Sequence, residues 1–317
     1  MPKLERPGYE RDPGAGATLK RTVKEFSQDN LTDWAAALTY YGVLAMFPAL
    51  IALVSIVGLV FSPQQVTDAL NQIVAQLGPA SAVETLKGPI EGITSDDGKA
   101  GIMLIVGIVA ALWAASGYVG AFMRASNVMH EVDEGRPVWK LRPLQMLVTL
   151  AMILLLALAA IAVVVTGPVA KAVGDAIGVG DAAVTAWNIG KWPVLVVIVS
   201  LMLAILYYAA PNAKLEGFRF ISPGALLAVL VWIVASAAFA FYVANFGSYD
   251  KTYGSLGGVV VFLVWLWITN VAVLLGAQLN SERERSRQFE RGVEGAEHEM
   301  RLGERDRPSE KQRTRTA

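Results

Sequence analysis

The chain has 317 residues, of which 54% are hydrophobic and only 17% charged, with a formal net charge of zero and a mean hydropathy of +0.47. This composition excludes an ordinary water-soluble globule and predicts an integral membrane protein. Cysteine is absent and histidine occurs only as His130 and His298, which excludes thiolate and disulfide chemistry and disfavours a histidine metal site; we therefore expect no cofactor.

The N-terminal residues 1–17 are rich in Pro, Gly and charge and contain no apolar run that could form a signal-peptide core. We expect them to be a disordered cytoplasmic lead. In the following segment Leu19, Val23 and Phe26 recur at helical spacing among basic residues. This pattern fits a short helix lying along the lipid headgroups, and equally a helix in solvent.

Six apolar runs in residues 18–280 are long enough to cross the roughly 30 Å hydrocarbon layer of a bilayer as helices. They are expected at about 34–61, 101–123, 143–166, 192–210, 222–246 and 254–279. The predicted fold class is therefore all-α: a polytopic integral membrane protein with six transmembrane helices.

The first and second spans carry polar residues toward one end. In the first, helical spacing places Asp33, Tyr40 and Tyr41 on one face, and Pro48 should bend the helix. The second span leads into a dense polar stretch of mixed charge sign, which suggests local ion pairs. That stretch holds Asn127, Glu131, Glu134, Arg136 and Arg142.

The last span contains the most informative polar pattern. Asn270 and Gln278 follow Trp267 at spacings that place the two amides on one helix face, and an amide facing lipid would be unsatisfied. We therefore expect this face to point inward. Gly254 and Gly258 form a small-xxx-small pair that would let another helix approach closely. Equally, the amides could serve only to hold helices together.

The charge distribution predicts the orientation. Of the 27 Lys and Arg residues, 22 lie in the lead, the tail and two connections on one side of the predicted spans, against five in the other connections. Both termini should be cytoplasmic. The tail, residues 281–317, is helix-prone at first and then largely disordered by composition. Glutamates interleave with its arginines, so no nucleic-acid partner is expected.

Three segments carry a recognisable combination of motifs. They are AAALTYYGVLAMFP at 35–48, LWAASGYVGAFMRASNVMHEVDEGRPVWKLR at 112–142, and LYYAAPN at 206–212 with YGSLGGVVVFLVWLWITNVAVLLGAQLN at 253–280. Together they resemble the YihY/virulence factor BrkB family of bacterial inner-membrane proteins, some of which were formerly labelled ribonuclease BN. The resemblance implies six helices and a role in transport or lipid handling. The family usually has glutamate where this chain has Gln278, which argues against a proton relay there.

The leading hypothesis is a non-enzymatic transporter or flippase-like protein for a lipidic or envelope-related solute in the bacterial inner membrane. No Walker motif and no clustered carboxylates suited to nuclease chemistry are present. The polar residues expected along a substrate path are Tyr40, Tyr41, Asn127, Tyr208, Asn212, Tyr242, Asn245, Asn270 and Gln278. Those expected at a cytoplasmic entrance are Asp33, Glu131, Glu134, Arg136 and Arg142.

The alternative is a structural or scaffolding membrane protein whose polar residues only hold the helix bundle together. Transport needs a cavity or groove that reaches into the membrane, whereas a scaffold can be fully packed. The lipid bilayer is the expected partner in either case, with a lipid or envelope precursor as the substrate of a transporter. A homo-oligomer is compatible with both hypotheses.

Overall fold

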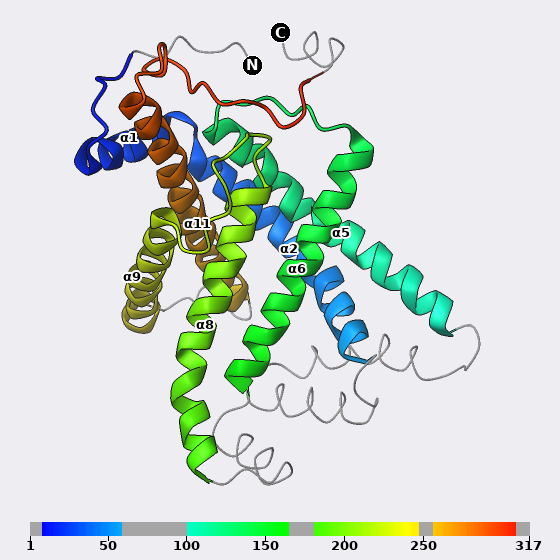
Figure 1. Cartoon of the computed structure of the whole chain (residues 1–317). Coiled ribbons are helices and arrows are strands. Elements are labelled where there is room, and N and C mark those ends of the chain that lie inside the picture. Colours follow the sequence, from blue (N-terminus) through cyan, green and yellow to red (C-terminus); the bar gives the residue numbers. More distant parts are fainter. Residues whose placement is uncertain (1–7, 59–99, 165–180, 247–255, 309–317) are drawn as a thin grey trace. The chain divides into compact units, whose positions relative to one another are not determined.

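The described residues form helices joined by turns and loops, in a computed structural model that covers residues 8–58, 100–164, 181–246 and 256–308 (Figure 1). Within these ranges there are seven helices and no strand: α1 (Ala15–Gln28), α2 (Leu31–Gly58), α5 (Ala100–Met129), α6 (Val138–Val164), α8 (Asp181–Ala209), α9 (Pro223–Phe246) and α11 (Leu256–Glu290). Five of them are long and apolar enough to cross a membrane. The all-α, polytopic class is thus confirmed.

The helix boundaries follow the hydropathy at some ends and depart from it at others. α9 begins at Pro223 as expected, because Ser222 Oγ accepts the Ala225 N–H at 3.1 Å and proline lacks the donor that its position would leave unpaired. Two helices begin earlier than expected: α6 at Val138 rather than residue 143, and α8 at Asp181 rather than residue 192. Pro143, taken as the start of the third span, lies inside α6, and Pro193, next to the expected start at Trp192, lies inside α8.

Contacts between Cα atoms divide the chain into two units, and each is described by itself. The first unit comprises Met1–Tyr41, Val119–Pro143 and Pro193–Ala317, and the second comprises Gly42–Tyr118 and Leu144–Trp192. In the second unit, α5 packs against α6 through a small apolar core of Ala111, Leu112 and Ile153. All the residues considered below as functional candidates belong to the first unit.

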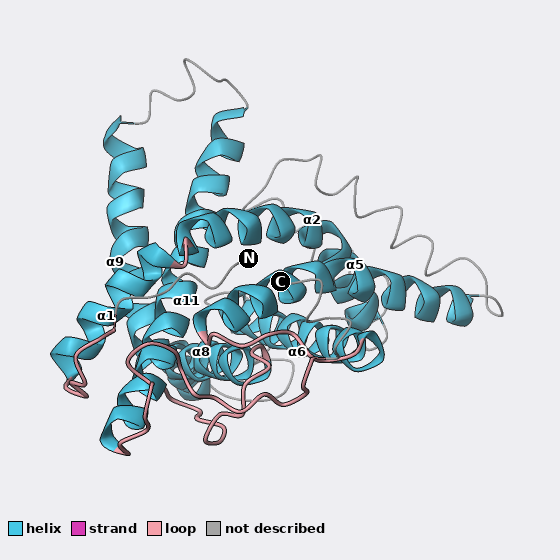
Figure 2. Cartoon of the chain, turned by 90° about the horizontal axis from the view of Figure 1, so that it is seen from above, coloured by secondary structure: helices cyan, strands magenta, loops and turns pink. Residues whose placement is uncertain are grey.

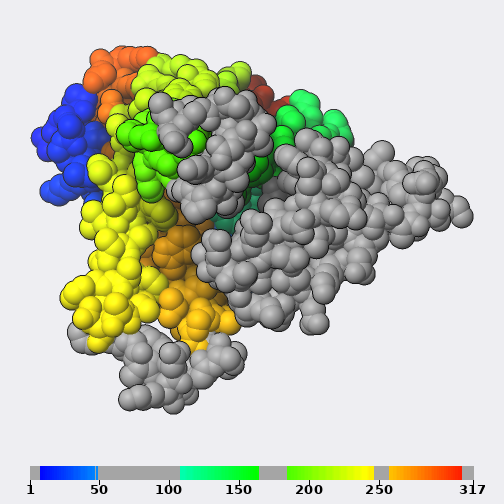
Figure 3. Space-filling view, turned by 90° about the horizontal axis from the view of Figure 1, so that it is seen from below, coloured from blue at the N-terminus to red at the C-terminus, as the bar shows by residue number. Residues whose placement is uncertain are grey.

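α9 and α11 lie side by side in the first unit (Figures 2 and 3). Gly224 and Gly276 form the point of closest approach, because a Cβ added to either glycine would collide with the backbone carbonyl oxygen of the other. The sequence pattern indicated Gly254 and Gly258 instead. A Cβ on Gly258 would meet nothing within 4 Å, and Gly254 lies outside the described residues. The close contact between α11 and α9 therefore lies at Gly276, nearer the C-terminal end of α11 than the predicted Gly258.

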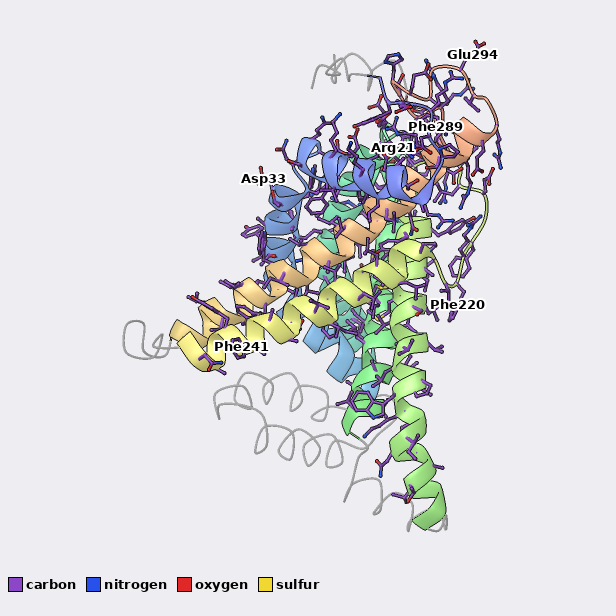
Figure 4. The ribbon with its side chains drawn as sticks, turned by 90° about the vertical axis from the view of Figure 1, so that its left-hand side faces the viewer. Arg21, Asp33, Phe220, Phe241, Phe289 and Glu294 are labelled. Carbon is purple, nitrogen blue, oxygen red and sulfur yellow. The ribbon has the colours of Figure 1, made fainter. Side chains whose placement is uncertain are left out.

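α1 packs its polar face, rather than its apolar face, against the C-terminal part of α11. Arg21 Nε donates to Glu282 Oε2 at 3.0 Å, and the hydroxyls of Thr18 and Ser286 lie 2.7 Å apart. The Arg21 guanidinium also stacks over the Phe289 ring at 5.1 Å, and both residues are labelled in Figure 4. Leu19 and Val23 are consequently exposed on the outer side of α1.

The described chain before α1 and after α11 is packed rather than disordered. Tyr9 N–H donates to the Glu297 carbonyl oxygen at 3.0 Å, and Arg11 forms an ion pair with Glu297. Ala296 and Met300 are buried. Composition had suggested disorder for residues 8–17 and much of 281–308, but opposite charges from distant segments pair here. We call residues 8–28, 130–136 and 281–308 the polar cap.

Candidate functional site

A pocket opens in the first unit where the ends of three helices meet the loop at residues 210–222. Its empty volume is about 680 Å³, with the open mouth included. Its walls include Ser126 and His130 at the end of α5, Tyr207 and Tyr208 at the end of α8, and Arg283 and Arg287 on α11. Because α8 and α11 both contain candidate spans, the pocket lies where apolar helices give way to polar chain.

The mouth of the pocket carries three arginines and two glutamates: Arg219, Arg283, Arg287, Glu216 and Glu284. Arg287 Nη1 donates to Glu284 Oε2 at 2.5 Å, so these two charges compensate each other. Glu216 forms an ion pair with Arg291, and the hydrogen bond from Arg291 is the largest cause of the lowered pKa of Glu216. Within the described residues, the side chains of Arg219 and Arg283 form no ion pair or hydrogen bond, although the Arg219 charge also contributes to the lowered pKa of Glu216. The mouth therefore has surplus positive charge.

His130 supplies a neutral acceptor to the same pocket. Its Nδ1 lies 2.8 Å from the Ser126 carbonyl oxygen, so the ring proton sits on Nδ1 and donates to that carbonyl. Burial lowers the pKa of His130 to about 4. At neutral pH the imidazole is therefore uncharged, and Nε2 has a lone pair that can accept a hydrogen bond from a hydroxyl or an amine.

Side chains fix the first turn of α9 beside the pocket. Asn280 Nδ2 donates to Ser222 Oγ at 2.9 Å, and Asn280 Oδ1 accepts the Gly224 N–H at 3.0 Å. The Ala225 N–H donates to Ser222 Oγ, so two backbone amides at the start of α9, those of Gly224 and Ala225, are bonded to side chains and cannot bind a ligand. The pocket must take its charge from the arginines and not from the helix terminus.

Asn270 and Gln278 are both buried, each with about 1% of its surface exposed, so the amide face of α11 points into the protein. Asn270 Nδ2 donates to Thr39 Oγ1 of α2 at 3.1 Å, which ties the two helices together. Gln278 Oε1 is buried without a hydrogen-bond partner among the described residues. Neither amide lines the pocket.

Four of the residues expected along an inner path lie elsewhere. Tyr40 is 61% exposed, and Tyr41 is half-buried beneath the Arg124 guanidinium, 5.6 Å from its ring centre. Tyr242 and Asn245 are exposed on α9. Asn245 Nδ2 donates to the Phe241 carbonyl oxygen of its own helix at 2.8 Å, so the amide needs no partner from another helix. Tyr40, Tyr242 and Asn245 are therefore exposed rather than inward-facing as expected, and Tyr41 is only half-buried.

Asn127 and Asn212 form a closed hydrogen-bonded cluster. Asn127 Oδ1 accepts the Asn212 N–H at 2.7 Å, and its Nδ2 donates to Glu134 Oε2 at 3.0 Å. Asn212 Nδ2 donates to the carbonyl oxygens of Asp133 and Asp306, both at 2.8 Å. Every polar atom of the Asn212 side chain is thus paired, because its Oδ1 also accepts the Asp306 N–H. This pairing braces the loop after α8 and leaves little capacity to bind a solute.

The residues expected at a charged entrance do not gather into one. Arg136 forms an ion pair with Glu134 and donates to the Ala209 and Ala210 carbonyl oxygens at the end of α8. Glu131 pairs with Arg285 inside the polar cap. Asp33 and Arg142 are exposed, Asp33 in the first turn of α2, as labelled in Figure 4. The charges of Glu131, Glu134 and Arg136 are therefore engaged in contacts within the fold.

Tyr208 is the one predicted path residue that lines the pocket. The Arg305 guanidinium stacks on its ring at 4.7 Å, and Arg305 Nη2 donates to the Tyr208 carbonyl oxygen at 2.7 Å. The pocket arginines were not singled out from the sequence. The available signal was the spacing of Arg283 and Arg287, one helical turn apart on a helix that continues past its apolar run.

The described residues hold no group of three or more His, Cys, Asp or Glu side chains that could bind a metal ion. We therefore assign no metal to the pocket, whose polar lining consists of guanidinium, carboxylate, hydroxyl, imidazole and amide groups.

Comparison with known proteins places the chain in a family. The family model for virulence factor BrkB matches residues 22–301. The chain is 32% identical over 265 residues to the ribonuclease-like protein YfkH of Bacillus subtilis, covering 83% of this chain and 94% of that protein. It is 26% identical to a UPF0761 membrane protein of Aggregatibacter aphrophilus, covering 81% and 88% of the two chains. No solved structure matches. The chain therefore belongs to the virulence factor BrkB family of membrane proteins.

Proposed function

We propose that this protein is a non-enzymatic, flippase-like transporter of a lipidic or envelope-related solute in the bacterial inner membrane. The observation that carries the proposal is the pocket at the junction of α5, α8 and α11, which combines a charged mouth with apolar walls next to candidate spans. A lipid has the same two-part character: its headgroup fits the mouth while its acyl chains stay along the outer surface of the helices.

The topology that we propose has six spans and both termini in the cytoplasm. α2 supports the sixth span, because it is helical over the 28 residues from Leu31 to Gly58. The excess of Lys and Arg at one end of the spans supports the orientation. Since the chain has no cysteine, single cysteines can report the side directly. Glu294→Cys should react with a membrane-impermeant maleimide only after the membrane is opened, and Ser95→Cys in intact cells.

Movement of lipid can be measured in liposomes that contain the purified protein and a fluorescently labelled phospholipid. A quencher added outside reaches only the outer leaflet of empty vesicles, so quenching beyond that fraction reports movement between leaflets. We expect additional quenching with the protein and a slower rate for the double variant Asn270→Leu, Gln278→Leu. Absence of movement would favour the scaffold. An unchanged rate in the double variant would mean that the amides only hold helices together.

A further inference from the structure

The loop before α9 exposes three large apolar side chains in a row around a single arginine. Phe218, Phe220 and Ile221 are 49%, 38% and 61% exposed, and Figure 4 shows Phe220 pointing away from the helices. The loop joins α8 to α9, which both contain candidate spans. Side chains of this kind at the ends of spans are typical of the membrane interface. The mouth of the neighbouring pocket is thereby placed at the level of the headgroups.

Two arginines that line this same pocket have no ion-pair partner in the described chain. Arg219 lies within the loop, between Phe218 and Phe220, whereas Arg283 lies on α11, and both are exposed. Guanidinium groups bind phosphate oxygens through paired N–H donors. Positive charge that is uncompensated by the protein favours a headgroup with net negative charge over a zwitterionic one, because the ammonium of the latter would be repelled.

The rest of the pocket suits the remainder of such a lipid. Ala204, Leu215 and Ala277 give the wall an apolar character, and Leu226 and Leu230 on the adjoining α9 are exposed along a surface that acyl chains can cover. The neutral His130 offers Nε2 as an acceptor for a hydroxyl of the headgroup.

We propose that this pocket binds the headgroup of an anionic glycerophospholipid, with Arg219 and Arg283 on the phosphate and His130 on a headgroup hydroxyl. Its part in transport rests on the proposed function, but binding itself does not. The protein can hold this lipid in place whether or not it moves it between leaflets.

The test uses the full-length protein in detergent and native mass spectrometry with added phosphatidylglycerol or phosphatidylethanolamine. We expect tighter binding of phosphatidylglycerol, and about a fivefold loss for each of Arg219→Gln and Arg283→Gln, the effect of about one interfacial cation. Arg301→Gln is the matched control, because Arg301 belongs to the polar cap, lies outside the pocket and has an exposed side chain. Arg283→Lys should retain part of the affinity.

Three results would overturn the proposal. Equal binding of the two lipids would remove the charge selectivity, and an equal loss in Arg301→Gln would reduce the effect to general surface charge. Competition by inorganic phosphate at the same concentration as phosphatidylglycerol would show that the site takes free phosphate and not a lipid. If binding is selective but no labelled lipid moves in liposomes, the proposed transport fails and this site stands.

Discussion

Arg285 is a fully buried guanidinium at the centre of the polar cap, and its removal should destabilise the protein strongly. Arg285 Nε donates to Glu282 Oε1 at 3.2 Å, Nη2 to Glu131 Oε1 at 2.6 Å, and Nη1 to the Ala296 carbonyl oxygen at 3.0 Å. The three acceptors belong to α11, to the turn after α5 and to the segment after α11. One side chain thus joins three parts of the chain.

The size of the effect follows from what Arg285→Met leaves behind. Glu282 keeps Arg21 as a partner, and Glu131 Oε2 keeps the Met300 N–H at 2.6 Å, but each carboxylate loses its contact with the Arg285 charge in a site closed to water. Breaking a buried ion pair by removing one partner costs about 3–5 kcal/mol. Arg301→Met removes only the exposed contact with Glu299, for which about 0–1 kcal/mol is expected.

Thermal unfolding in detergent, followed by tryptophan fluorescence, compares the two variants, and limited trypsin digestion reports whether residues 291–308 detach. Arg285→Met should unfold at a clearly lower temperature and lose this segment early. Adding Glu131→Gln to Arg285→Met should recover part of the stability, because the amide is neutral and its oxygen can still accept the Met300 N–H. Two results would show that buried charge pairing does not hold the polar cap together. One is that Arg285→Met unfolds at the same temperature as Arg301→Met. The other is that adding Glu131→Gln to Arg285→Met recovers no stability.

Three further predictions concern single sites. Burial lowers the pKa of His130 to about 4, from about 6.5 in the unfolded chain. As the pH falls, the unfolded state takes up the proton first, so the free energy of unfolding should decrease between pH 6.5 and 4 by up to roughly 3 kcal/mol. His130→Gln should flatten this part of the pH profile of thermal unfolding. Gly276→Ala should separate α9 from α11 and lower the unfolding temperature, whereas Gly258→Ala, which meets open space, should not; equal effects would refute the contact. Gln278→Leu should be neutral or stabilising, since its Oε1 has no partner in the described chain. Asn270→Leu should cost about 0.5–1.5 kcal/mol, because it removes the hydrogen bond to Thr39 Oγ1 while the Thr39 hydroxyl keeps its own bond to the Ala35 carbonyl oxygen. The reverse order in a thermal shift assay would contradict this reasoning.

The membrane helices could be predicted because their physical cause is local. A run of apolar residues must satisfy its own backbone hydrogen bonds in lipid, which only a helix can do within one segment. α9 was placed almost to the residue, since Ser222 and Pro223 supply both the cap and the first turn. The early starts of α6 and α8 escaped prediction, because the packing of the residues before Pro143 and before Trp192 decides whether they are helical, and sequence alone does not give this packing.

The polar cap could not be predicted because its causes are distant in sequence. Arg21 pairs with Glu282, 261 residues away, and Glu131 pairs with Arg285, 154 residues away. A prediction from composition treats such stretches as solvated, because composition gives the number of charged residues but not which of them form ion pairs. The same limit applies to Asn245, which was expected to face an inner substrate path: it lies exposed, and its amide donates to the Phe241 carbonyl oxygen one turn earlier in the same helix. Asn270 and Gln278 are buried as expected, because two amides on one helix face would lack hydrogen-bond partners if that face pointed into lipid.

The distribution of paired and unpaired charge separates structural from functional polar residues in the first unit. Asn212, Glu134 and Arg136 have their polar atoms directed at one another and at backbone carbonyls, so a solute would have to break those bonds before it could bind. Arg219 and Arg283 have no such bonds within the described chain, and their positive charge is turned to the mouth of the pocket, beside an apolar loop. A ligand can bind these two arginines without breaking a hydrogen bond or ion pair of the described chain. This contrast supports the proposed anion recognition at this pocket, whereas the buried charges of the polar cap pair with one another.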